Sequence, residues 1–504
     1  MKRMKNIVKI TSVLMLMFSI VSCSDYLDVN DSIDNQNLDR LNPNELIVGA
    51  QALSAETYTN RLNRVGNWMG VAWSGNYLAF NDAYGLESRY QFSNTFYDDV
   101  WDNMYRYISN FATIEKYNGD DKNWNNQKAA AKILKAFYFQ YIVDLYGDAP
   151  YTEAFDGTNN LFPAYDDSKD IYMDLVASID EAINMMDTTS EDFGANDITF
   201  NGDMSKWIAF GNTVKLRLLV RLTLKAASDA EISTFVTTEF AKLSGAQFVT
   251  EDVTINPGYA NTDNRQNPFW EVYGFTPANI PTGQGGQTGP SEFAFNLLDS
   301  SNDPRLRRLW KPNTINSNTF AGTPQNGTGN AASIGDGVLK GAGAALPIML
   351  VAESYFLQAE AVQRGFMSGS AKALFDQGVR ASFNTLGIFD SDDINMDNIP
   401  DNWVTNYITV IDADAALGFN GGDALGAILT QKWIALTSVS GAELWIEYNR
   451  TGYPTNLPLP LMITDPNIPV RLLYPASEYS GNSSNVRSQT RGDAFTSKIF
   501  WDVN

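Results

Sequence analysis

Apolar residues recur every three or four positions in several stretches of the chain, the spacing that predicts amphipathic helices. Residues 128–148, KAAAKILKAFYFQYIVDLYGD, have an aromatic-rich face, and Gly147 stands where a helix C-cap is expected. A second helix is expected behind a cap at Ser168, and a third between Trp207 and Leu222. The apolar stripes on which these expectations rest are Leu134, Tyr138, Tyr141 and Leu145; Tyr172, Leu175, Ile179, Ile183 and Met186; and Trp207, Phe210, Val214, Leu218 and Leu222.

The same spacing occurs twice between residues 351 and 387, in VAESYFLQAEAVQRGF and SAKALFDQGVRASFNTLG. We expect Gly365 to end the first helix and Ser370 to open the second, with a tight turn between them. Small residues at the expected crossing (Ala359, Ala361 and Ala381) predict a helical hairpin like those of tetratricopeptide repeats. No strict period of about 34 residues is present, so any such repeats must be degenerate.

Between the helical blocks, residues 250–345 are rich in Gly, Asn, Thr and Pro, which is typical of long surface loops. Loops of that length are uncommon in a compact protein unless they are functional or disordered. We therefore expect a mostly α-helical domain over residues 43–504, with a helical scaffold at about 43–230 and 347–450 and a loop-rich insert at about 250–345.

The N-terminus has the pattern of a lipoprotein signal. Four basic residues lead into the apolar run 10–21, which is too short to span a bilayer and is typical of a secretory signal peptide over residues 1–22. Ile20-Val21-Ser22-Cys23 is similar to a bacterial lipobox, which makes Cys23 a lipidation site carrying acyl chains such as palmitate. The alternative is an ordinary buried cysteine inside a conventional signal sequence. As the only cysteine, Cys23 cannot form an internal disulfide.

Charge and composition exclude several functions. Removing the signal leaves 36 − 4 = 32 basic residues against 58 acidic ones, a net charge of −26, so nucleic-acid binding is not expected. The chain has no histidine, which rules out Ser-His-Asp triads, Cys-His pairs and histidine-based metal sites. An enzyme would have to use carboxylate, lysine or tyrosine chemistry.

Six blocks, in order, give the chain a resemblance to the SusD/RagB family of Bacteroidetes outer-membrane lipoproteins, in its SusD-like starch-binding branch. They are SCSDYLD after the signal, LYGDAPYTEAF at 145–155, NDPRL at 302–306, AESYFLQAEAVQRG at 352–365, ELWIEYNRTGYP at 443–454 and RLLYPASEYSGNSSNV at 471–486. The resemblance implies a SusD-like fold with four tetratricopeptide-like hairpins and a loop-rich ligand-binding face.

The resemblance also implies a function and a place in the cell. Such a lipoprotein captures oligosaccharide outside the cell and closes as a hinged lid on a SusC-like TonB-dependent β-barrel transporter, without catalysing a reaction. Residues 23–42 would be the acylated tether on the outer membrane, and SDYLD is similar to the family's surface-export signals, which assigns that role to Asp25 and Asp28. Adjacent acids are usual in strong export signals, whereas these two are three residues apart.

Two stretches have the composition of a sugar-binding site, with flat aromatic rings beside amide and charged side chains. NRVGNWMGVAWSGNYLAFND lies early in the chain, where its glycines at 66, 70 and 75 argue against a long regular helix, and NTDNRQNPFWEVYGF lies in the loop-rich insert. The resemblance places the family's ligand site on an early segment and a middle loop. The candidate ligand-binding residues are Trp68, Trp73, Asn76, Tyr77, Arg265, Asn267, Trp270 and Tyr273. The alternative is that most of these aromatics fill gaps between helices.

Other functions have weaker support. Glu443 and Glu447 are spaced like the paired acids of a glycosidase, but Arg450 three residues farther on makes an ion pair with Glu447 the better interpretation. DSDDINMDNIPD at 390–401 departs from an EF-hand loop, so no metal site or cofactor is predicted, although a structural calcium remains an alternative. Peptide binding in the same fold is the closest alternative function. The negative charge ranks neutral glycans above acidic ones, unless Arg61, Arg64 or Arg265 forms a local basic patch.

Overall fold

Helices dominate the fold, as the hydrophobic spacing predicts. The structure is a computed structural model that describes residues 41–76, 84–190, 193–314, 318–392, 402–463 and 465–504. The first helical block contains α2 (Pro43–Thr57), α3 (Asn63–Met69), α4 (Gly85–Ser88), α5 (Asp98–Lys116), α6 (Asn125–Tyr146), α7 (Ser168–Met185), α8 (Met204–Leu222) and α9 (Ala230–Lys242). The last block contains α14 (Val351–Gln363), α15 (Ala371–Thr385), α16 (Trp403–Ile411), α17 (Ala424–Leu436), α18 (Gly441–Thr451), α19 (Ala476–Gly481) and α20 (Asp493–Thr496).

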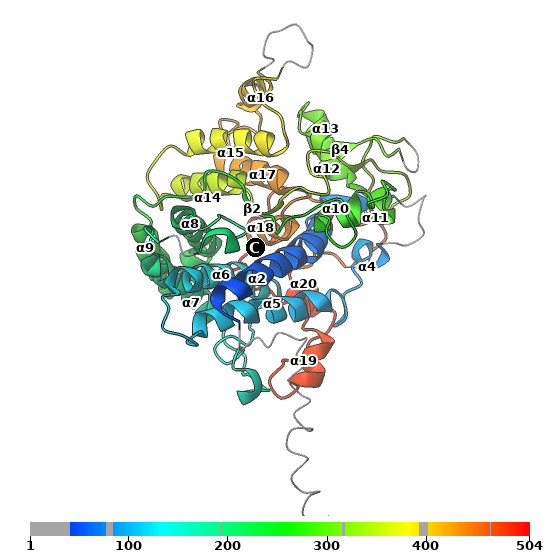
Figure 1. The fold of residues 1–504 in the computed structure, drawn as a ribbon. Coiled ribbons are helices and arrows are strands. Elements are labelled where there is room, and N and C mark those ends of the chain that lie inside the picture. Colours follow the sequence, from blue (N-terminus) through cyan, green and yellow to red (C-terminus); the bar gives the residue numbers. More distant parts are fainter. Residues whose placement is uncertain (1–40, 77–83, 191–192, 315–317, 393–401, 464) are drawn as a thin grey trace, which may run out of the picture.

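Short elements fill the middle of the chain. Its helices are α10 (Pro268–Tyr273), α11 (Gly283–Gln287), α12 (Glu292–Ser300) and α13 (Leu306–Leu309). Three antiparallel strand pairs join distant segments: β1 (Trp73–Gly75) with β3 (Thr288–Pro290), β2 (Val253–Ile255) with β6 (Leu346–Met349), and β4 (Trp310–Lys311) with β5 (Ser333–Ile334). Figure 1 shows α10–α13 gathered at one side of the molecule, beside both helical blocks. The expected loop-rich insert is therefore built from one- and two-turn helices and very short strands.

The local helix signals agree with the structure at most positions. Helix α6 ends at Gly147, whose φ of 82° is in the left-handed region that favours glycine. Ser370 caps α15 by accepting a hydrogen bond from the Ala373 amide, and the tight turn to α14 is present. For α7 the cap is Asp167 and not Ser168, because the Asp167 side chain accepts from the Lys169 amide. Sequential helices α5 to α8 pack as neighbours, as do α14 and α15; their likeness to tetratricopeptide hairpins stays a prediction.

Of the three glycines at 66, 70 and 75, only Gly66 lies inside a helix. Helix α2 continues through a π-helical turn, Tyr58–Leu62, directly into α3, which ends at Gly70. Gly66 lies inside α3 because α18 crosses there: a Cβ on Gly66 would lie 2.1 Å from the carbonyl carbon of Gly441. Trp68 therefore lies in a helix, but not in a long regular one: α3 follows a π-helical turn and ends at Gly70, and Gly75 is already in β1.

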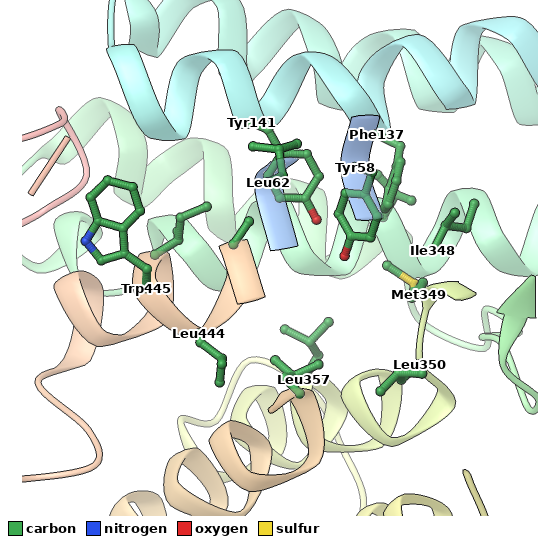
Figure 2. Close-up of a cluster of buried hydrophobic side chains, with 14 of the residues drawn as sticks. Tyr58, Leu62, Phe137, Tyr141, Ile348, Met349, Leu350, Leu357, Leu444 and Trp445 are labelled. Carbon is green, nitrogen blue, oxygen red and sulfur yellow. The ribbon is translucent and has the colours of Figure 1, made fainter. Parts of the chain in front are cut away.

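The π-helical turn and α6 contribute aromatic rings to the hydrophobic core. Figure 2 shows Tyr58 and Leu62 pointing towards Phe137 and Tyr141 of α6, with Leu357 of α14 and Trp445 of α18 nearby. The ring centroids of Tyr58 and Tyr141 are 5.5 Å apart. Burial of such rings is the main force that holds the helical blocks together.

Candidate functional site

The two stretches proposed for ligand binding meet in the structure. Strand β1 from the early stretch pairs with β3 from the insert, with Trp73 opposite Pro290 and Gly75 opposite Thr288. The pairing continues beyond the strand, because the Asn76 amide donates to the Gln287 carbonyl at 2.8 Å. Backbone hydrogen bonds thus fasten the early stretch to residues 287–290 of the insert, and the two candidate stretches themselves meet through the rings of Trp73 and Tyr273.

The tryptophans and tyrosine of these stretches pack on other rings inside the protein. The Trp73 and Tyr273 centroids are 5.3 Å apart, and the Trp73 indole N–H donates to the Ser438 hydroxyl at 2.9 Å. Trp68 is likewise buried, with its ring 4.9 Å from that of Tyr84. At 0%, 0% and 2% exposure, Trp68, Trp73 and Tyr273 offer no ring face to a ligand from solvent. Their assignment as ligand platforms is therefore corrected. The three residues instead fill gaps between helices and strands, which was the alternative interpretation.

Two candidate amides have structural roles. Asn267 caps α10 by accepting from the Phe269 and Trp270 amides, and its Nδ2 donates to the Ala344 carbonyl at 2.9 Å. Asn76 is buried, and its Nδ2 donates to the Gly286 carbonyl at 3.4 Å. Both are therefore corrected from ligand contacts to backbone partners. Tyr77 lies outside the described residues, as do Cys23, Asp25 and Asp28.

Arg265 lies on the surface, at the edge of an open groove. The groove has a volume of about 920 Å³, open solvent included, and runs between the C-terminal half of α2 and the segment 257–271. We name it the Tyr259 groove; its lining includes Leu53, Glu56, Pro257, Tyr259, Arg265 and Glu271. Trp270 is half-buried and, with Asn267, lines a separate pocket whose volume is about 510 Å³, open solvent included. Of the candidate residues that the structure describes, only Arg265 thus reaches the groove.

Local turn geometry presents Tyr259 to the groove. Asn256 Oδ1 accepts hydrogen bonds from the amides of Gly258 and Tyr259, both at 2.9 Å, which fixes an Asx turn after the strand β2. The Arg265 guanidinium donates to the Gly258 carbonyl at 3.2 Å and steadies the same turn. Tyr259 is half-buried, so part of its ring is open to solvent. An aromatic residue directly after Asn-Pro-Gly was the sequence signal that could have identified it.

Two carboxylates give the groove its electrostatic character. Burial raises the pKa of Glu56, and the negative charge of Glu271 raises it further. Neither carboxylate forms a hydrogen bond or ion pair with a described residue. Burial also raises the pKa of Tyr259, so its phenol stays a neutral donor at physiological pH. The groove therefore offers free acceptors, a guanidinium and a partly exposed ring beside Leu53, which is 39% exposed; hydroxyl groups and weakly apolar C–H faces complement such a surface.

The proposed basic patch at Arg61 and Arg64 is neutralised by acidic neighbours. Arg64 Nη2 lies 2.7 Å from Glu87 Oε1, and Arg61 Nη2 lies 2.7 Å from Asp99 Oδ1. The paired acids cancel the charge that would attract an anionic sugar.

The Glu443 and Glu447 pair is closed to substrates. Glu443 is fully buried and Glu447 almost so. Arg221 donates to Glu443 at 2.8 Å, and Arg450 donates to Glu447 at 2.7 Å. The ion-pair interpretation is therefore confirmed for Glu447, and a glycan cannot reach either carboxylate in this structure.

The described residues contain no cluster of three or more side chains suited to a metal ion. Residues 393–401, most of the acidic stretch considered for calcium, lie outside them. Asp390 is described, and it binds Arg380 and Thr405. Within the described part of the chain, no helix has the length and apolar character needed to cross a membrane.

Comparison with known proteins gives a family and a fold. A family model described as starch-binding and associating with the outer membrane matches residues 35–475. Searching the curated proteins finds none that matches.

Similar solved structures include a chitin-binding protein at 23% identity (TM-score 0.71, covering 92% of this chain and 100% of that chain). A chitin-binding SusD homologue from Flavobacterium johnsoniae is 22% identical (TM-score 0.70, 91% and 99%). A SusD homologue from Bacteroides fragilis is 19% identical (TM-score 0.70, 88% and 95%). At such identities these likenesses show a shared fold over nearly the whole chain.

Proposed function

Because this chain belongs to the SusD-like family of starch-binding proteins that associate with the outer membrane, we propose that it captures neutral oligosaccharides at the cell surface and delivers them for uptake without catalysis. The match over residues 35–475 is the observation that carries the proposal. Two similar structures are of chitin-binding proteins, which makes fragments of starch and of chitin the first ligands to test.

The Tyr259 groove is our proposed capture site. A sugar ring would lie against the open part of the Tyr259 ring and the exposed Leu53 side chain. Its hydroxyls would donate to Glu56 and Glu271 and accept from Arg265, groups that now face solvent. Such a shallow site must overcome the loss of ligand freedom, so we expect a Kd between micromolar and millimolar, about −8 to −4 kcal/mol.

Membrane attachment and delivery complete the proposal. After removal of residues 1–22, acylated Cys23 would anchor the tether 23–42 in the outer membrane, with Asp25 and Asp28 directing it to the cell surface. The partner would be a SusC-like TonB-dependent transporter, which the protein covers as a hinged lid. Replacing Cys23 by Ala should move the protein from the membrane fraction to the soluble fraction, and affinity purification of the wild type should recover the transporter.

Affinity electrophoresis and calorimetry test ligand capture. The chain without residues 1–23 is measured against soluble starch, malto-oligosaccharides and chitin oligosaccharides. Tyr259→Ala and Arg265→Ala should each weaken binding of the recognised glycan about ten-fold, because each removes a stacking face or a charged donor, worth about 1–2 kcal/mol.

Tyr479→Ala is the matched control, since Tyr479 is also a half-buried tyrosine but lies on α19. Its affinity for glycan should equal that of the wild type. If the wild type binds glycan and both groove variants bind it equally well, the binding site lies elsewhere on the protein. No binding across the panel would contradict capture of neutral glycan and leave peptides as the alternative.

A further inference from the structure

A second polar groove lies on the hairpin of α14 and α15. It has a volume of about 850 Å³, open solvent included, and we name it the Tyr355 groove. Tyr355 comes from α14, and Gln377 and Asn384 come from one face of α15, seven residues apart. Asp252 and Lys340 close the groove from the middle of the chain. The function proposed above uses none of these residues.

The groove presents solvent-facing amide groups, which bond to no described side chain, beside an aromatic ring. Tyr355 is half-buried, while Gln377 and Asn384 are exposed, and none of the three side chains bonds to a described residue. By contrast, Asp252 is held in place, because it accepts from the Val351 amide at 2.9 Å and from the Thr385 hydroxyl at 2.8 Å. A fixed wall with free amides and a phenol suits the hydroxyls and C–H face of a sugar.

The charges of this groove are balanced. Arg380 is paired with Asp390 at 2.7 Å, and Glu251 is paired with Lys206. Lys340 and Asp252 contribute one charge of each sign. Such a surface has no electrostatic preference for an acidic ligand, which favours a neutral glycan.

Strand β2 connects the two grooves. Asp252 of the Tyr355 groove directly precedes β2, and Pro257 of the Tyr259 groove follows it after one residue. Five residues of extended chain cover at most about 17 Å, a distance that a short run of linked sugars can span. Figure 1 shows β2 between α14 and α10.

The loop 342–344, which follows Lys340 of the Tyr355 groove, is fastened to the Tyr259 side. Asn267 holds this loop with two hydrogen bonds: its backbone amide donates to the Ala342 carbonyl at 2.7 Å, and its side chain donates to the Ala344 carbonyl. Asn256 Nδ2 donates to the Gly343 carbonyl at 3.3 Å. These bonds hold the separation of the two grooves constant, which is the condition for one ligand to occupy both.

We propose that the Tyr355 groove is a second glycan subsite, and that one neutral polysaccharide chain runs from the Tyr259 groove along β2 into it. The inference rests on the function proposed above. A long glycan that is already bound in the Tyr259 groove reaches the Tyr355 groove without a second loss of translational freedom. Longer chains should therefore bind more tightly than short ones, without any change in the Tyr259 groove.

Calorimetry with malto-oligosaccharides and chitin oligosaccharides of two to eight sugars tests this. For the glycan that binds, the wild-type Kd should fall by about ten-fold or more from disaccharide to octasaccharide. Tyr355→Ala, and separately the double variant Gln377→Ala, Asn384→Ala, should remove most of that gain. The surface double variant guards against a folding defect in Tyr355→Ala, and Gln363→Ala on the exposed end of α14 is the matched control that keeps the gain.

The outcomes separate the two proposals. A length-dependent gain that survives both groove variants overturns the second subsite and leaves capture at the Tyr259 groove intact. A wild-type Kd that does not change with length also overturns it. Failure of the wild type to bind either series overturns the proposed function, and the second subsite with it.

Discussion

Gly66 is the residue on which the crossing of α3 and α18 depends. A Cβ there would lie 2.1 Å from backbone atoms of Gly441, so the helices would have to separate. We expect Gly66→Ala to lower the free energy of unfolding by about 3 kcal/mol or more, since overpacking against backbone cannot be relieved by a rotamer change. Urea denaturation followed by circular dichroism measures the change.

Gly49→Ala is the control for that substitution. Gly49 is also inside a helix, α2, but nothing lies within 4 Å of the position its Cβ would take. Alanine should therefore stabilise the protein there by about 0.5–1 kcal/mol, through its better helix propensity. Equal effects at both glycines would contradict the close crossing.

Asp144 gives a second prediction at the residue scale. Burial raises its pKa to about 6, although Arg221 opposes the shift. Because the unfolded pKa is about 3.9, the folded protein holds the proton more tightly, and the contribution of Asp144 to stability falls as the pH rises from about 4 to about 6. Asp144→Asn keeps a neutral side chain. Relative to the wild type, its free energy of unfolding should therefore increase by about 2–3 kcal/mol between pH 4 and pH 7.5.

Asp187→Asn should respond to pH in the opposite direction. Hydrogen bonds from Thr189 lower the pKa of Asp187, so its ionised form stabilises the folded state at neutral pH. Because a lowered pKa changes stability only as the pH falls below the unfolded value of about 3.9, Asp187→Asn is compared with the wild type between about pH 5.5 and pH 2.5, and Asp144→Asn between pH 4 and pH 7.5, by denaturation in urea. A parallel response of the two variants would contradict the different environments assigned to these carboxylates.

Residue roles were predictable where they depend on neighbours in sequence. Gly147 and Ser370 were identified from helix-end rules that involve only a few adjacent residues. The buried position of Trp73 could not be predicted in this way, because its indole N–H bonds to Ser438, which is 365 residues away in the sequence. Tyr259 was overlooked for the same reason, since its groove is completed by Leu53 and Glu56 of α2.

At the scale of elements, buried ion pairs join three long helices. Arg450 of α18 donates to Glu360 of α14 at 2.7 Å, and Arg221 of α8 donates to Glu443 of α18 at 2.8 Å. Glu360→Gln would leave Arg450 buried with one carboxylate fewer, which should cost about 3–5 kcal/mol. Thermal unfolding of the variant, followed by circular dichroism of the helices, measures the loss of stability.

Lys206→Gln provides the comparison on the surface. Lys206 and Glu251 form an ion pair whose side chains are 48% and 60% exposed. Solvent screens such a pair, so its loss should change the free energy of unfolding by no more than about 0.5 kcal/mol. If Glu360→Gln costs no more than this control, the buried pairs do not hold the helices together.

Elements were predictable in proportion to their length. Helices α6, α14 and α15 each run for at least 13 residues, so their apolar faces repeat often enough to be recognised. Strands β1, β2 and β3 are only three residues long, too short for an alternating pattern. These strands nevertheless order the region around the site, because β1 and β3 join the early stretch to the loop-rich insert and β2 connects the two grooves along the chain.

At the scale of the whole molecule, the charge was fully available from the sequence, and it sets how salt affects binding. The full chain carries 36 basic and 58 acidic residues, a net charge of −22, and removal of the expected signal peptide would make it −26. A neutral glycan does not respond to this field, so its Kd should change by less than about two-fold between about 20 mM and 0.5 M NaCl. An acidic polysaccharide is repelled at low salt, and its binding should improve as salt screens the repulsion.

Polygalacturonate and its fully methyl-esterified form separate these cases, because they share a backbone and differ in charge. Affinity electrophoresis or calorimetry over the salt series should show weak binding of the acidic polymer that strengthens with salt, and no such trend for the ester. Tighter binding of polygalacturonate at low salt would mean that local cations such as Arg265 and Lys340 outweigh the charge of the whole molecule. The preference for neutral glycans would then have to be abandoned, since the grooves and not the net charge would decide which ligand approaches.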